Sequence, residues 1–152
     1  IGFLAGPAAS WINTDRWNLL MKHALDSGMT VVSIGPNLPT VEGGRDGLAE
    51  VRASGVSAII TYNDLMGIGL LRAATAAGIK VPEDLSIIGF DNIFGSDFTS
   101  PPLTTIEMPL EKIGGNAVRA LLSSLDDNDL VVHGSDESTS LLVRGSTGKA
   151  KA

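Results

Sequence analysis

The chain has 152 residues, an apolar fraction of 43% and a formal net charge of −6 at pH 7. This length suits one domain with a sizeable core, and the longest apolar runs are far too short to span a bilayer. The acidic balance, without any basic cluster, argues against direct DNA binding, because phosphate contacts need lysine and arginine. The absence of cysteine excludes disulfides and thiolate metal sites and fits a reducing compartment.

Strand and helix patterns alternate from the beginning of the chain. Residues 1–5 predict a short buried strand, followed by a helix that Ser10 or Asn13 can cap and Gly28 can end. Residues 29–34 predict the next strand. A helix over residues 41–54 is also expected, although three glycines weaken it.

The clearest unit is strand, helix, strand. Apolar runs at residues 56–60 and 85–90 flank a stretch, residues 65–75, with near-helical apolar spacing. Each run breaks on polar residues, at Asn63 and at Asp91. Near-continuous apolar strands joined by a helix are typical of a parallel sheet that is covered on both faces.

Asn63 and Asp91 carry the functional content of this unit. Both follow a predicted strand directly, and the carboxyl ends of parallel strands meet at the edge where open α/β proteins bind ligands. An amide beside a carboxylate can form several hydrogen bonds to a neutral, hydroxyl-rich molecule. The alternative is local: Asn63 or Asp64 caps the following helix, and Asp91 begins a turn.

The rest of the chain predicts fewer elements. Residues 93–98 have no period and indicate a loop, and residues 103–106 predict a short strand after two prolines. Residues 109–124 carry a helical apolar stripe. Residues 130–133 and 140–143 are candidate closing strands.

Three blocks in this order resemble one family: Tyr-Asn-Asp-Leu-Met-Gly-Ile-Gly at residues 62–69, the run ending Ile-Ile-Gly-Phe-Asp-Asn at residues 77–92, and Ser-Pro-Pro-Leu-Thr-Thr-Ile at residues 100–106. They are similar to the effector-binding core of lactose-repressor-type (LacI/GalR) transcriptional regulators. The resemblance implies an α/β fold, a three-layer α/β/α parallel-sheet lobe of the type I periplasmic-binding-protein-like kind.

In that family the regulatory core has two lobes joined by crossover strands. The resemblance therefore implies an effector-binding core over residues 1–145, in which residues 1–104 form the second lobe, residues 105–125 the tail of the first lobe, and residues 126–145 closing strands. Residues 146–152 are expected to be a disordered tail. The helix-turn-helix and most of the first lobe are expected outside this chain, as for a fragment of a longer protein.

The resemblance also assigns ligand residues. Arg16 falls where the family places an arginine that hydrogen-bonds the effector, and Asn63 and Asp91 match its amide and carboxylate positions. Without the resemblance, Arg16 would be read as a surface arginine on a helix. The fork of donors on an arginine can bind sugar hydroxyls or a carboxylate.

Four further residues are expected at the same edge. Ser10 and Trp11 follow the first strand, and Trp11 offers a flat apolar face that either stacks on a ligand ring or covers the helix start. Leu38 stands near a position where relatives often carry an aromatic platform, and Met108 where they often carry glutamine. The leucine argues against simple ring stacking at its position, for which Trp11 can compensate. The methionine predicts an effector that is less polar on that side, or different in kind.

The aromatic loop around Phe94 and Phe98 has two interpretations. The rings either plug the core beneath the loop or, as the resemblance implies, form a homodimer interface together with the helix that bears Ile68.

The sequence thus predicts a cytoplasmic small-molecule sensor, with a sugar, sugar phosphate, nucleobase or nucleoside as effector and lobe closure controlling DNA binding. Operator DNA would be bound only through the absent N-terminal domain, and neither a cofactor, a metal, a membrane nor a catalytic residue is implied. The alternative is an extracytoplasmic sugar-binding protein of a transporter. A small α/β enzyme with Asp91 as general base is a third possibility, but the sequence shows no fitting partner for it.

Overall fold

We describe residues 1–126 and 138–150 of a computed structural model of the chain. Its six strands form one sheet in the order β2-β1-β3-β4-β5-β6, parallel except for the antiparallel pair β5–β6. The strands are β1 (Gly2–Leu4), β2 (Val32–Ile34), β3 (Ala58–Thr61), β4 (Ser86–Asp91), β5 (Thr104–Glu107) and β6 (Ser140–Leu142).

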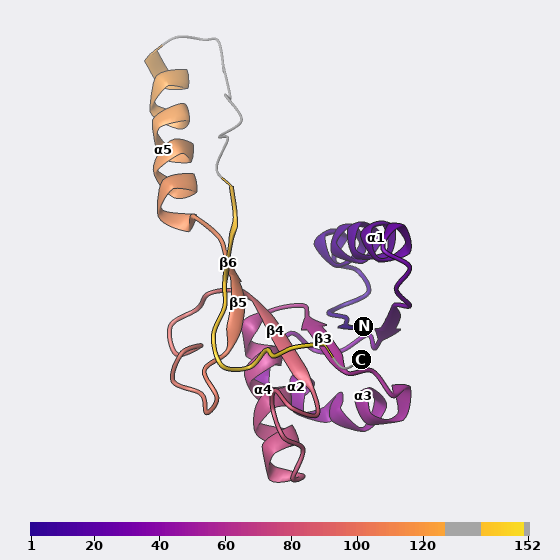
Figure 1. Ribbon diagram of the computed structural model, residues 1–152. Coiled ribbons are helices and arrows are strands. Elements are labelled where there is room, and N and C mark those ends of the chain that lie inside the picture. Colours follow the sequence, from indigo (N-terminus) through magenta and orange to yellow (C-terminus); the bar gives the residue numbers. More distant parts are fainter. Residues whose placement is uncertain (127–137, 151–152) are drawn as a thin grey trace.

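The helices lie on both sides of this sheet. They are α1 (Trp11–Asp26), α2 (Val41–Asp46), α3 (Leu48–Ser54), α4 (Asp64–Ala76) and α5 (Leu110–Asp126). In Figure 1, α1 lies on one side of the sheet and α2, α3 and α4 on the other, while α5 projects away from the rest. The predicted three-layer α/β lobe is confirmed.

The core fills the space between the sheet and the layer of α3 and α4. Apolar side chains from the strands meet Val51 of α3 and Met66, Leu70 and Leu71 of α4, all at most 2% exposed. Burial of such side chains contributes about 1.5–3 kcal/mol each relative to exposure. On the other face, Trp17 of α1 stacks on Phe3 with 6.3 Å between the ring centroids.

The register aligns the carboxyl ends of the parallel strands. Leu4 of β1 pairs with Thr61 of β3, and Asp91 of β4 pairs with Glu107 of β5. The segments that follow β1, β3, β4 and β5 therefore share one edge of the sheet, which we call the ligand edge.

The helix expected over residues 41–54 is two helices, α2 and α3, with Gly47 between them. The glycines of α2 serve packing: a Cβ on Gly44 would lie 2.0 Å from the Met66 carbonyl oxygen of α4. On the α4 side of the same contact, a Cβ on Gly69 would lie 1.9 Å from the Val41 carbonyl oxygen of α2. The glycines that lower helix propensity thus let α2 and α4 touch backbone to backbone.

The prediction of a disordered tail from residue 146 is wrong for Ser146 to Gly148. Ser146 is fully buried, and its hydroxyl donates to the Ile87 carbonyl at 2.6 Å and accepts from the Thr104 amide at 2.8 Å. The Gly148 amide donates to the Ser86 hydroxyl at 3.2 Å. These polar residues are ordered because they extend the hydrogen bonding of β4 and β5. Of the candidate closing strands, β6 is confirmed, and residues 130–133 lie outside the described residues.

Candidate ligand-binding edge

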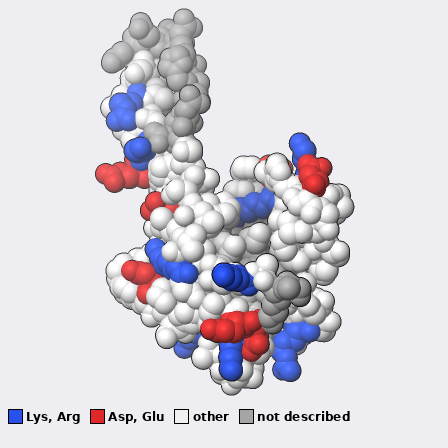
Figure 2. Space-filling model, viewed as in Figure 1, with Lys and Arg blue, Asp and Glu red and all other residues white. Residues whose placement is uncertain are grey.

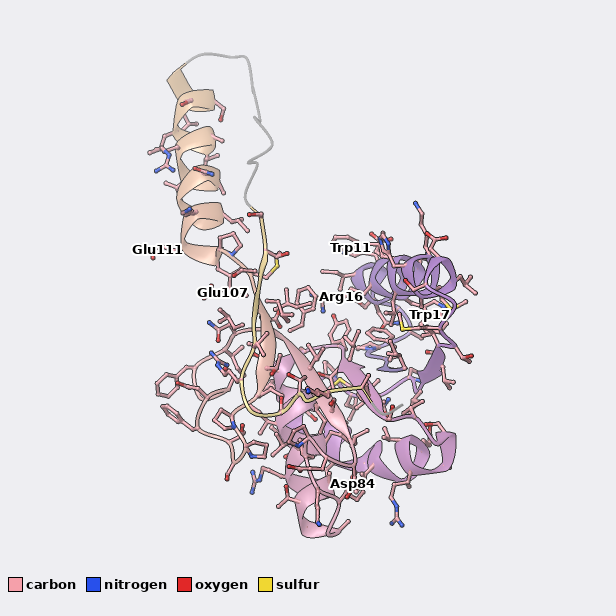
Figure 3. All side chains as sticks on the ribbon, in the orientation of Figure 1. Trp11, Arg16, Trp17, Asp84, Glu107 and Glu111 are labelled. Atoms are coloured by element: carbon pink, nitrogen blue, oxygen red, sulfur yellow. The ribbon has the colours of Figure 1, made fainter. Side chains whose placement is uncertain are left out.

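Arg16 reaches from α1 to the ligand edge. Its guanidinium donates to the Tyr62 carbonyl, directly after β3, and lies over the Phe90 ring with 3.5 Å between Cζ and the ring centroid. The side chain is only 16% exposed. In Figure 3 it points from α1 toward the ends of β4 and β5. A surface arginine without a defined role, the alternative interpretation, does not fit this burial.

Asp91 is the acidic partner of Arg16. An Arg16 guanidinium nitrogen lies 3.8 Å from an Asp91 carboxylate oxygen, and the Asp91 side chain is 36% exposed. Burial raises the pKa of Asp91, although the charge of Arg16 pulls it back down. Burial likewise lowers the pKa of Arg16, against the raising effect of Asp91. The structure thus brings together two of the residues predicted from the sequence.

The backbone at Asp91 and Asn92 is strained. Both residues have a positive φ, 108° and 52°, although neither is glycine. Such conformations cost about 1–3 kcal/mol each and persist only where the surroundings impose them. We call these two residues the Asp91-Asn92 corner. Strain of this kind clusters at functional sites, and the corner presents Asp91 at the ligand edge.

Asn92 ties the corner to its neighbours. Its side-chain amide donates to a Glu107 carboxylate oxygen at 2.9 Å, and its side-chain carbonyl accepts from Arg144 at 2.8 Å. Arg144 also donates to the Ser96 hydroxyl at 3.0 Å and to the Leu103 carbonyl at 2.9 Å. Sequence reasoning missed Asn92 and Arg144. The polar break at residues 91–92 was a signal for Asn92, but no local pattern marks Arg144.

Asn63 caps α4, as the local alternative predicted. Its side-chain carbonyl accepts from the Met66 amide at 3.0 Å, and its side-chain amide donates to the Pro39 carbonyl at 3.2 Å. The second N–H of that amide is not needed for either bond. A ligand contact from Asn63 therefore stays a prediction beside its role as a cap.

Ser10 and Trp11 stand at the start of α1. Ser10 is the N-cap, its hydroxyl accepting from the Asn13 amide, and it lies 3.2 Å from the Tyr62 hydroxyl. Trp11 is 74% exposed, so it covers little of the protein itself. Its indole face is available to a ligand at this edge.

Leu38 and Met108 border the same region. Leu38 is 68% exposed and precedes Pro39, which accepts from Asn63. Met108 lines an open pocket of about 310 Å³ together with Asp91 and Glu107. Figure 2 shows a hollow between α1 and the β5 side of the sheet, with a basic side chain inside it.

The predicted interface residues lie in the loop after β4 and in α4. Phe94 and Phe98 are 92% and 71% exposed, and their rings meet edge to face with 5.1 Å between centroids. The alternative that both rings plug the core is therefore wrong. Phe98 and Ile68 line one open groove of about 540 Å³ between α4 and the aromatic loop.

Two further findings concern metal-binding groups and membrane-spanning helices in the part of the chain that the structure describes. Residues 1–126 and 138–150 hold no group of three or more His, Asp or Glu side chains that could bind a metal ion. No helix within those same ranges is long and apolar enough to cross a membrane.

Fold and edge together define an α/β domain of the binding-protein class. The chain belongs to the family of periplasmic binding protein-like domains, whose profile matches residues 1–147. Its resemblance to the effector-binding domain of lactose-repressor-type regulators is also confirmed, by the relatives that follow.

Two curated relatives are named as regulators. The chain is 42% identical over 73 residues to the HTH-type transcriptional repressor PurR of Vibrio atlanticus, which covers 48% of the chain and 22% of that protein. It is 36% identical over 114 residues to the HTH-type transcriptional regulator MalR of Streptomyces coelicolor, covering 75% of the chain and 33% of that protein. Such relatives favour a regulator over the predicted alternative, a binding protein of a transporter.

A solved structure extends the likeness over nearly the whole chain. The LacI family transcriptional regulator from Enterococcus faecium, with bound ribose, superposes with a TM-score of 0.87 at 28% identity, covering 99% of this chain and 57% of that one. The chain thus spans about half of that structure, and 22% and 33% of the two curated relatives.

Proposed function

We propose that this chain is the effector-binding part of a cytoplasmic transcriptional regulator, and that its effector is a sugar or a sugar-like molecule such as a nucleoside. The observation that carries the proposal is the half-buried pair of Arg16 and Asp91 at the ligand edge. Support also comes from the strained corner that presents Asp91. The ribose in the related Enterococcus faecium regulator fits the same chemistry.

The pair suits a molecule with adjacent hydroxyl groups. A hydroxyl donates to the Asp91 carboxylate and accepts from the Arg16 guanidinium, so a diol can satisfy both charged groups at once. Asn63 and Ser10 add polar contacts, and Trp11 covers one face of the ring. Leu38 and Met108 place apolar surface opposite the less polar sides of the effector.

The effector would bridge two lobes. Residues 1–104 form the second lobe in this proposal, and residues 105–125 belong to the first. The projection of α5 in Figure 1 supports this division, as does its exposed apolar stripe, which includes Leu121 and Leu125 at 60% and 75% exposure. Closure around the effector changes the relative population of two states, and no covalent step is needed.

DNA binding belongs to residues outside this chain in this proposal, and the regulator acts as a homodimer. Its interface takes its apolar anchors from the exposed Phe94 and Phe98 and from the partly buried Ile68. A change in the effector-bound lobes is thereby passed on to a pair of DNA-binding heads.

Calorimetry on the full-length protein tests the assignment. A panel of D-ribose, lactose, maltose, hypoxanthine and adenosine identifies a binder, which is then titrated into Arg16→Ala and Asp91→Ala. We expect each substitution to weaken binding at least tenfold, because a hydrogen bond to a charged group contributes about 1.5–3 kcal/mol. Operator affinity without effector should be unchanged.

Arg52→Ala is the matched control, since Arg52 is an exposed arginine on α3. Wild-type affinity for the binder in Arg16→Ala and Asp91→Ala would refute the proposed site. Binding by a panel member with concurrent turnover would refute the sensor and favour an enzyme.

A further inference from the structure

Asp64 is a charged residue that the proposed site does not use. It is the first residue of α4 and is fully buried, although aspartate is almost never buried unless it is paired. It does not cap α4, because Asn63 provides the cap. Its role must therefore be found in the groups that its carboxylate accepts from.

Both carboxylate oxygens of Asp64 turn to the segment around the Asp91-Asn92 corner. One oxygen accepts from the Ile93 amide at 2.9 Å, directly after the corner. The other accepts from the Thr105 hydroxyl at 2.6 Å, and that hydroxyl accepts in turn from the Asn92 amide at 3.3 Å. Asp64 thus holds two consecutive backbone amides of the strained segment, one directly and one through Thr105.

The neighbouring strand leaves room for this carboxylate. A Cβ on Gly89 of β4 would lie 2.0 Å from an Asp64 carboxylate oxygen, so any side chain there would displace Asp64. Burial raises the pKa of Asp64, which the bonds from Thr105 and Ile93 and the charge of Arg144 lower again. Burial of the Asp64 carboxylate is thus unfavourable, and the bonds that it accepts from Thr105 and Ile93 offset part of that cost.

We propose that Asp64 is a positioning residue for the ligand edge: it fixes the reversed backbone at Asp91 and Asn92 and so aims the Asp91 carboxylate at Arg16. Its importance for effector binding rests on the proposed function of Asp91. Its effect on the position of the Asp91 carboxylate does not rest on that function and can be measured without any effector.

The test measures how far the charge of Arg16 shifts the pKa of Asp91 in the effector-free, full-length protein. The pKa of Asp91 is followed by ¹³C NMR on aspartate-labelled samples, with and without Arg16→Met. In the wild-type background this substitution should raise the pKa of Asp91, because the charge of Arg16 lowers it. We expect the rise to shrink to about half or less in Asp64→Asn, because a released corner lets Asp91 turn away.

The comparison separates the positioning role of Asp64 from the effect of its charge and from a general loss of stability. Loss of the Asp64 charge acts on Asp91 with and without Arg16, so it cancels in the difference. Thr104→Val is the matched control: Thr104 is 1% exposed, and its hydroxyl bonds to Thr147 and to the Arg144 amide instead of the corner. The full rise should persist in that variant.

An undiminished rise in Asp64→Asn overturns the proposal, and so does an equal reduction in Thr104→Val. If Asp64→Asn does not fold, Thr105→Val tests the relayed contact, since it removes the hydroxyl between Asp64 and the Asn92 amide and keeps the Asp64 charge; a smaller rise is expected there, and an undiminished rise overturns the proposal. A failure of effector binding in the calorimetric test would instead refute the proposed function and leave this geometric result standing.

Discussion

At the scale of single residues, the orientation of Arg16 depends on Phe90. The guanidinium lies over the face of that ring, with 3.5 Å to its centroid, so the aromatic face sets the plane of the arginine fork. Phe90→Leu keeps the apolar bulk and removes the π-face. We expect effector affinity to fall about fivefold in calorimetry, since a cation–π contact is worth about 0.5–2 kcal/mol. Phe90→Tyr, which keeps the face, should bind normally, and an equal loss in both variants would contradict this role.

A second residue-scale prediction concerns Asp91 and pH. Burial raises its pKa above the ordinary value of 3.8, so folding favours the protonated carboxyl. Its contribution to the free energy of unfolding is therefore greatest below that ordinary value and is lost as pH rises through the raised pKa. We expect Asp91→Asn to gain stability relative to wild type as pH rises from about 4 to 7. Urea unfolding across that range checks it, and a relative gain toward low pH would refute it.

The sequence predicted the charged pair of this site but not the groups that hold it. Asp91 directly follows a predicted strand, where the position of a side chain follows from the order of strands, whereas Arg16 was assigned through the family resemblance. The positive φ at Asp91 was not predictable, because glycine, its usual sign, is absent there. Arg144 was missed because its partner Asn92 is 52 positions away along the chain.

At the scale of elements, α2 and α4 depend on glycine for their distance. A Cβ on Gly69 would lie 1.9 Å from the Val41 carbonyl oxygen and 3.0 Å from the Arg45 amide nitrogen, both backbone atoms. Gly69→Ala must therefore push the helices apart. We expect it to lower the free energy of unfolding by about 1–3 kcal/mol, as overpacking does. Chemical denaturation measures the change.

Gly114→Ala is the control for Gly69→Ala. Gly114 lies within α5, and a Cβ there would meet nothing within 4 Å. The substitution should be neutral or stabilising by up to about 1 kcal/mol, because alanine is the better helix former. Equal destabilisation at both positions would show that close packing is not the cause.

These glycines also explain why the helix expected over residues 41–54 was predicted less well than the strands. Propensity counts glycine against a helix over residues 41–54, whereas the structure uses Gly43 and Gly44 for contact with neighbouring backbone. The prediction of a disordered tail was wrong for a related reason. Polar composition predicted disorder, but Ser146 completes hydrogen bonds at the ends of two strands, which only the assembled sheet provides.

At the scale of the whole molecule, two exposed apolar surfaces have different proposed partners. The stripe of α5, including Leu121, Leu122 and Leu125 at 57–75% exposure, would pack on the first lobe of the same polypeptide. The aromatic loop with Phe94 and Phe98 would pack on a second copy. Large exposed apolar patches generally mark interaction sites, so both surfaces call for a partner.

Two substitutions in the full-length protein tell these surfaces apart. Phe98→Ser should weaken the dimer at least tenfold, about 1.4 kcal/mol or more, while the melting temperature measured above the dissociation constant changes little. Leu121→Ser should leave the dimer intact and destabilise the fold by about 2–5 kcal/mol, because it removes a side chain that the first lobe covers. Sedimentation gives the first quantity and denaturant unfolding the second. The reverse outcome, dissociation by Leu121→Ser and unfolding by Phe98→Ser, would exchange the two partners and refute the proposed division of the lobes.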